Sequence, residues 1–140
     1  MKAFDTDVLV EILDGNADVL ARLATIPARE QAVPIVVAEE ILRGRLNAVR
    51  QAESRKLRVT LPLAYEFLHQ SLVALRGVAF LLCTDEADLQ FREWRSQGIR
   101  VATHDLRIAA ICVVHRARLI SRNRRDFDRV PGLDVEYWDR

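Results

Sequence analysis

Cysteine, glycine, proline and long apolar runs are all scarce in this sequence, and each scarcity excludes a class of protein. The 140 residues include two cysteines, five glycines and four prolines. Two cysteines cannot form a Cys-rich zinc site or a disulfide framework, so we expect Cys83 and Cys112 to be small buried hydrophobic residues. So few glycines and prolines exclude collagen-like and low-complexity chains.

Membrane insertion and secretion are also disfavoured. The longest nearly apolar run covers residues 78–83, far short of the roughly 20 apolar residues that a membrane-spanning helix needs. The N-terminal sequence MKAFDTDVLVEILDG has acids where a signal peptide needs its apolar stretch. We therefore expect a cytoplasmic protein that does not bind a membrane.

The composition is that of one folded domain. Half of the residues are hydrophobic and 29% are charged, and a chain of this length has room for a single domain over residues 1–140. The net charge of +1 argues neither for nor against a nucleic-acid partner. Most basic residues are arginines, and twelve basic residues form two clusters: Arg43, Arg45, Arg50, Arg55, Lys56 and Arg58, and Arg116, Arg118, Arg122, Arg124, Arg125 and Arg129. Such clusters are also typical of solvated helix faces and loops.

Helical and strand-like segments alternate along the chain. Apolar spacing predicts strands at 2–5, 32–37, 118–121 and 134–138, and helices at 8–13, 17–26, 41–52, 62–82, 85–96 and 106–115. Thr6 or Asp7 is the expected cap of the first helix, and Gly77 is a point where the long helix at 62–82 could break. This alternation predicts an α/β protein, a three-layer α/β/α sandwich with a mainly parallel central sheet.

Acidic residues follow predicted strands or begin apolar helices at four places. They are Asp5, the pair Glu39 and Glu40, Asp105, and Asp126. Ligands of open parallel sheets bind beyond the carboxyl ends of the strands, so acids there would converge on one pocket. Converged carboxylates repel unless a cation is present, and an all-oxygen ligand set favours Mg²⁺ or Mn²⁺. Such an ion is suited to hydrolysis at phosphorus.

Each acid also has a simpler interpretation. Asp5 could cap a helix, Asp105 could interact with a helix dipole, and Asp126 could be an ordinary loop acid. Adjacent helical residues point about 100° apart, so only one of Glu39 and Glu40 can face a site.

Taken together, these segments resemble the PIN-domain ribonucleases, and among them the VapC-type toxins of bacterial toxin–antitoxin pairs. The matching segments are FDTDVL at 4–9, VVAEEILRG at 36–44, THDLRIAA at 103–110, SRNRRDF at 121–127 and VPGLDVEYW at 130–138. Residues 50–95 match only as helix. The resemblance implies a PIN-like fold for the whole chain.

The resemblance also implies roles for individual residues. Asp5 resembles the first metal ligand of the family, with the hydroxyl of Thr6 beside it. In the family the second acid stands four residues before a glycine, so Gly44 selects Glu40. Asp105 resembles the third acid and metal ligand.

Two further residues match the last motif of the family. Asp126 resembles the fourth, weaker acid, and Asn123 occupies the polar position that precedes it. The family usually carries Thr where Ser121 stands, and it varies at His104, to which we assign no role.

The implied activity is Mg²⁺-dependent endoribonuclease cleavage that leaves a 5′-phosphate and a 3′-hydroxyl, with Mn²⁺ as a substitute ion. The targets of the family include tRNA. Arginines beside the acids would then hold the RNA backbone, namely Arg43, Arg45, Arg122, Arg124 and Arg125. The family further implies a homodimer and a cognate antitoxin protein as partner.

Two alternatives remain open from the residues alone. FDTDVL also resembles the opening motif of haloacid-dehalogenase-type phosphatases, with Asp5 as a covalent nucleophile, but these enzymes need a downstream lysine and the chain offers only Lys56. A non-enzymatic, receiver-like or partner-binding α/β domain could also place acids at strand ends. Receivers need a lysine late in the chain, which this sequence lacks.

Overall fold

The computed structural model describes residues 1–55 and 58–139. Lys56, one of the predicted basic cluster, lies outside the described residues. The chain forms two compact units, one built from Met1–Val37 with Ala79–Arg140 and the other from Ala38–Val78. The prediction of a single domain over residues 1–140 stays a prediction.

The first unit is built around a five-stranded sheet in the order β3-β2-β1-β4-β5. All four strand pairs are parallel, and in the central pair Phe4 lies opposite Ile120. The strands are β1 (Lys2–Phe4), β2 (Gln31–Pro34), β3 (Phe80–Leu81), β4 (Arg118–Ser121) and β5 (Val135–Tyr137). The parallel pairing places the carboxyl ends of β1 and β4 side by side, and the predicted parallel sheet is confirmed.

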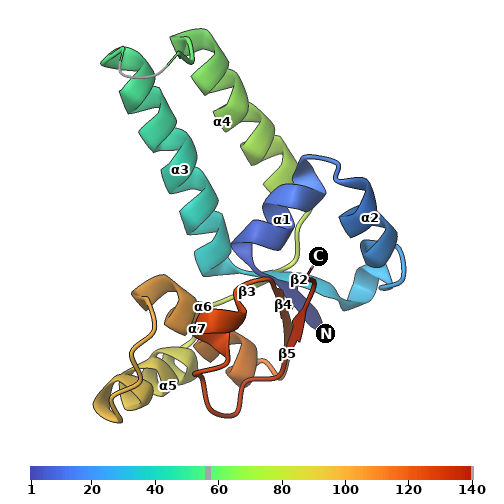
Figure 1. The fold of residues 1–140 in the computed structure, drawn as a ribbon, viewed down its shortest axis with the longest axis vertical. Coiled ribbons are helices and arrows are strands. Elements are labelled where there is room, and N and C mark those ends of the chain that lie inside the picture. The colour runs from blue at the N-terminus through green and yellow to red at the C-terminus, as the bar shows by residue number, and fades with distance from the viewer. Residues whose placement is uncertain (56–57, 140) are drawn as a thin grey trace. The chain divides into compact units, whose positions relative to one another are not determined.

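Helices cover both faces of this sheet, as the α/β/α prediction requires. α1 and α2 lie on one side, and α5 and α6 lie on the other (Figure 1). The helices of this unit are α1 (Thr6–Leu13), α2 (Ala17–Leu23), α5 (Asp85–Ser96), α6 (Thr103–Val114) and α7 (Arg124–Phe127), with a 3₁₀ turn at Ala28–Glu30. α6 packs against β2 and β4, and its residues from Ile108 to Cys112 are buried all round.

The predicted strand at 32–37 is wrong in its second half. β2 ends at Pro34, and Ile35–Glu53 form helix α3. Proline has no N–H to donate to a strand ladder, and its fixed φ suits the start of a helix. The β-branched residues that follow are buried in either conformation, so their apolar pattern could not separate strand from helix.

The predicted helix at 62–82 ends close to Gly77, where a break is expected, and its last part is not helical. α4 covers Leu61–Leu75, and the short strand β3 follows after Gly77. The predicted helix at 17–26 is shorter as well, because Ala24 already caps α2. A two-residue strand carries no alternation that a sequence pattern could reveal.

The second unit consists of the rest of α3 and of α4. Val49 and Ala52 of α3 pack with Ala64 of α4 in a small apolar core. Arg45 ties the same two helices together, because its Nε donates to Ser71 Oγ at 2.9 Å and its guanidinium lies 5.5 Å from the centroid of Phe67.

The two cysteines differ in their surroundings. Cys112 is buried in α6 as expected, but Cys83 is exposed, so that half of the prediction is wrong. None of the helices within residues 1–55 and 58–139 has the length and apolar character that a bilayer crossing requires.

Candidate active site

The site begins with Asp5, the residue that directly follows β1. Its side chain is 4% exposed. One carboxylate oxygen accepts a hydrogen bond from the backbone N–H of Thr6 at 2.8 Å, so Asp5 is the N-cap of α1. The predicted cap at Thr6 or Asp7 is wrong, and the alternative interpretation that Asp5 caps a helix is confirmed. Asp5 is therefore fixed both by the end of a central strand and by the start of a helix.

Ser121 holds the other oxygen of Asp5. It is the last residue of β4, is fully buried, and donates its hydroxyl to Asp5 Oδ2 at 2.7 Å. The same hydroxyl oxygen accepts the backbone N–H of Asn123 at 3.0 Å. Ser121 thereby connects the first acid to the segment that carries the last one.

Asn123 joins two further acids. Its side-chain NH₂ donates to Asp126 Oδ2 at 2.9 Å and to Asp105 Oδ2 at 3.3 Å. Its side-chain oxygen accepts the backbone N–H of Asp126, which makes Asn123 the N-cap of the short helix α7. One hydrogen-bonded chain thus runs from Asp5 through Ser121 and Asn123 to Asp105 and Asp126.

All three acids of this network stand at the start of a helix. Asp5 caps α1, Asp105 is in the first turn of α6, and Asp126 is in the first turn of α7. The partial positive charge of a helix N-terminus interacts favourably with a nearby carboxylate. Carboxylates that share one hydrogen-bond donor still repel one another, and a bound cation would relieve this repulsion.

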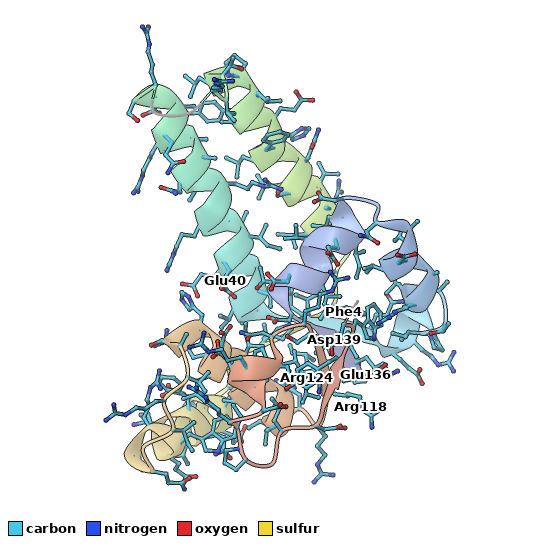
Figure 2. All side chains as sticks on the ribbon, viewed as in Figure 1. Phe4, Glu40, Arg118, Arg124, Glu136 and Asp139 are labelled. Carbon is cyan, nitrogen blue, oxygen red and sulfur yellow. The ribbon has the colours of Figure 1, made fainter. Side chains whose placement is uncertain are left out.

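Glu40 belongs to the second unit, where it lies on α3 (Figure 2). Its neighbour Glu39 is exposed and forms an ion pair with Arg43 at 2.8 Å, whereas Glu40 is partly buried. The meeting of Asp5, Glu40 and Asp105 stays a prediction. Within residues 1–55 and 58–139, no three His, Cys, Asp or Glu side chains are grouped tightly enough to hold a metal ion.

Three of the predicted RNA-binding arginines are held by partners within their own unit. Arg45 binds Ser71, as described above. Arg122 forms an ion pair with Glu11 of α1 and donates to the backbone oxygen of Trp138. Arg124 forms an ion pair with Asp139.

The other two predicted RNA-binding arginines, Arg43 and Arg125, have exposed side chains. The ion pair of Arg43 with Glu39 is an exposed contact between residues four apart on a helix, which contributes only about 0.3–0.5 kcal/mol. Both guanidinium groups are therefore available to a phosphate.

The pKa of Cys112, a residue of α6, is raised by two features of its surroundings. Burial raises the pKa of the Cys112 thiol, and the negative charge of Asp5 raises that pKa further. The thiol stays protonated near neutral pH and is neither a nucleophile nor a metal ligand there.

Sequence reasoning missed the bridging role of Ser121 and the pairing of Glu11 with Arg122. The signal for Ser121 was present, because a hydroxyl that directly follows the apolar residues Leu119 and Ile120 of a strand needs a buried polar partner. No sequence signal links Glu11 to Arg122, which is 111 residues away.

Comparison with known proteins identifies the family. The sequence model of the PIN domain matches residues 2–133. Ribonuclease VapC2 of Rickettsia felis is 33% identical over 48 residues, which is 34% of this chain and 36% of that protein. This chain is thus aligned with about a third of the length of that curated relative.

Solved structures share the fold. VapBC2 from Rickettsia felis, bound to a DNA fragment from its promoter, matches with a TM-score of 0.74 at 18% identity and covers 99% of this chain and 98% of that one. A toxin–antitoxin complex from Klebsiella pneumoniae matches with a TM-score of 0.70 at 21% identity and covers 97% and 96%. With the sequence match extending over residues 2–133, the chain belongs to the PIN domain family.

Proposed function

We propose that this protein is a metal-dependent endoribonuclease and the toxin of a toxin–antitoxin pair. The observation that carries the proposal is the hydrogen-bonded chain that joins Asp5, Asp105 and Asp126 at the carboxyl ends of β1 and β4. The names of the similar proteins, a ribonuclease VapC2 and VapBC and toxin–antitoxin complexes, support the same activity.

Carboxylates are the donor type that a hard divalent cation prefers. Asp5, Glu40 and Asp105 would hold Mg²⁺ through their carboxylates, with Mn²⁺ as a substitute. When bound, the ion supplies Lewis-acid activation of water and neutralises charge on the phosphate. Ser121 and the backbone of Thr6 hold the Asp5 carboxylate in one orientation.

The site also orients the reactants. Asn123 donates to both Asp105 and Asp126. In this proposal Asp5, Glu40 and Asp105 orient water for in-line attack, and Asp126 is a weaker fourth acid. Arg43 and Arg125 would bind the RNA backbone, because their charges are exposed. The products would carry a 5′-phosphate and a 3′-hydroxyl.

Partners and location are part of the same proposal. A toxin of this class requires a cognate antitoxin protein, acts on RNA in the cytoplasm, and forms a homodimer. The first RNA substrate to test is tRNA.

The PIN family match argues against the two alternatives. A haloacid-dehalogenase-type phosphatase and a receiver belong to other families, and the match covers nearly the whole chain. In addition, both oxygens of Asp5 accept hydrogen bonds, which suits a fixed ligand better than an attacking nucleophile.

Substitution of the acids by their amides tests the proposal. We expect Asp5→Asn, Glu40→Gln and Asp105→Asn to lower RNA cleavage by at least about 100-fold while circular dichroism stays that of the folded protein. Asp126→Asn should cost roughly 10-fold. The matched control is Asp7→Asn, which removes a neighbouring exposed carboxylate and should leave cleavage unchanged. Glu39→Gln should leave kcat unchanged, although it also frees Arg43 from its ion pair.

Chelation provides the second test. Excess EDTA should stop cleavage, and added Mg²⁺ or Mn²⁺ should restore it. Full activity of Asp5→Asn, or cleavage that continues in EDTA, would disprove the assignment. Sequencing of the 5′-phosphate ends produced after induced expression identifies the RNA.

A further inference from the structure

The two arginines that flank Asn123 are both bound by the C-terminal segment of residues 137–139. Arg122 donates from Nε to the backbone oxygen of Trp138 at 2.9 Å. Arg124 forms an ion pair with Asp139 (Figure 2). Its guanidinium lies 4.2 Å from the centroid of the Tyr137 ring. The residue that joins two acids of the site is therefore held from both sides.

The same segment also holds the far end of α7. The Tyr137 hydroxyl donates to Asp128 Oδ1 at 2.7 Å, and Asp128 is the C-cap residue of α7. Burial raises the pKa of the Tyr137 phenol, and its hydrogen bond to Asp128 raises that pKa further, so the phenol is a hydrogen-bond donor at neutral pH. Tyr137 thus contacts the residues at both ends of the helix.

A helix as short as α7 needs such support. It contains four residues, and isolated helices well below about 12 residues are unstable in water. Its third residue is Asp126, whose carboxylate shares the Asn123 amide with Asp105. Repulsion between these two carboxylates favours movement of Asp126 away from the site unless α7 is held in place.

We propose that Arg124, Tyr137 and Asp139 are positioning residues that fix α7 and so hold Asp126 and Asn123 in the active site. This inference rests on the proposed nuclease function and deepens it. It assigns Arg124 to a structural contact inside the molecule, in place of the RNA contact that its sequence context predicts. The Arg124 guanidinium lies over the Tyr137 ring and is paired with Asp139, so two contacts together hold it against the C-terminal segment.

The two roles of Arg124 predict opposite effects of Asp139→Asn. If Asp139 positions α7, this substitution lowers kcat of RNA cleavage by roughly 5- to 20-fold and leaves KM within about twofold. If Arg124 binds RNA, loss of its competing carboxylate leaves kcat unchanged and lowers KM. That second result would overturn the inference.

Substitutions of the other two positioning residues follow the same logic. Tyr137→Leu should lower kcat as Asp139→Asn does, and Tyr137→Phe, which keeps the ring and loses the hydroxyl, should have a smaller effect. Arg124→Ala should lower kcat without changing KM. If Arg124→Ala instead raises KM and lowers the slope of log binding affinity against log salt concentration by about 1, Arg124 contacts an RNA phosphate. That result would contradict the inference.

Asp134→Asn is the matched control. Asp134 forms an exposed ion pair with Arg118 at 3.1 Å, so this variant makes the same change in charge on another exposed Arg–Asp pair. It should keep the kcat and KM of the parent protein. Equal losses of kcat in Asp134→Asn and Asp139→Asn would show that the loss comes from the change in net charge and not from the position of Asp139. That result would overturn the inference.

Hydrogen exchange of the metal-free protein gives a readout that does not depend on activity. The amides of Asp126 and Phe127 are bonded to Asn123, and in Asp139→Asn and Tyr137→Leu we expect their protection to fall at least about fivefold while α6 stays protected. Unchanged protection of α7, or an equal loss in α6, would overturn the inference. Activity in Asp5→Asn would instead refute the proposed nuclease, and the exchange experiment would still test the positioning of α7.

Discussion

Removal of the Ser121 hydroxyl should destabilise the protein more than removal of most single polar groups. Ser121 is fully buried, and its hydroxyl makes two hydrogen bonds, one to the carboxylate of Asp5 and one from the backbone of Asn123. Loss of a hydrogen bond to a charged group costs about 1.5–3 kcal/mol, and loss of a neutral one about 1 kcal/mol. Ser121→Ala should therefore lower the free energy of unfolding by roughly 2–4 kcal/mol, or Tm by roughly 6–16 °C.

Urea denaturation measures this loss directly. The midpoint should fall while the m-value stays constant, because the variant exposes the same surface when it unfolds. Ser121→Thr keeps the hydroxyl and should retain most of the stability. A loss below about 0.5 kcal/mol in Ser121→Ala, or an equal loss in both variants, would show that the hydroxyl does not hold the Asp5 carboxylate.

Three further predictions use other features of the first unit. The raised pKa of Tyr137 means that the unfolded chain releases this proton at a lower pH than the folded protein. Stability should therefore fall as pH rises above about 10, and Tyr137→Phe should show a shallower decline in denaturation measured from pH 8 to 11. Iodoacetamide at pH 8 should alkylate the exposed Cys83 and spare the buried Cys112, as mass spectrometry can check; equal labelling in native protein would contradict the burial of Cys112. Gly98 follows α5 with φ +83°, and an added Cβ would meet nothing within 4 Å, so Gly98→Ala should cost about 1 kcal/mol in urea denaturation from backbone strain alone.

Regular periodicity predicted the elements with a clear pattern. α5 at Asp85–Ser96 and β4 at Arg118–Ser121 have the predicted bounds, because a capping Thr84 and a short apolar run mark them clearly. Apolar segments without alternation were assigned less well. The residues after Pro34 are predicted as strand but form a helix, and the residues of β3 are predicted as helix but form a strand. In both segments the apolar residues run together without the alternation that separates a strand from a helix.

The candidate site was also predictable in part. The positions of Asp5, Asp105 and Asp126 at element ends follow from pattern and resemblance, and the structure joins these three through hydrogen bonds. The sequence indicates that Ser121 needs a polar partner, but only the folded chain shows that this partner is Asp5. No sequence signal links Tyr137 to Asp128. The arginines show the same limit, since sequence gives their charge and not their partners.

The bond between Asp5 and Ser121 also bears on when the protein becomes active. These residues are 116 positions apart, and ribosomes add about 5–20 residues per second. Roughly 6–23 s of synthesis therefore separate the first acid from the hydroxyl that holds it. A nascent chain cannot form this bond until Ser121 has been synthesised, so a site that depends on the bond is completed only after that interval.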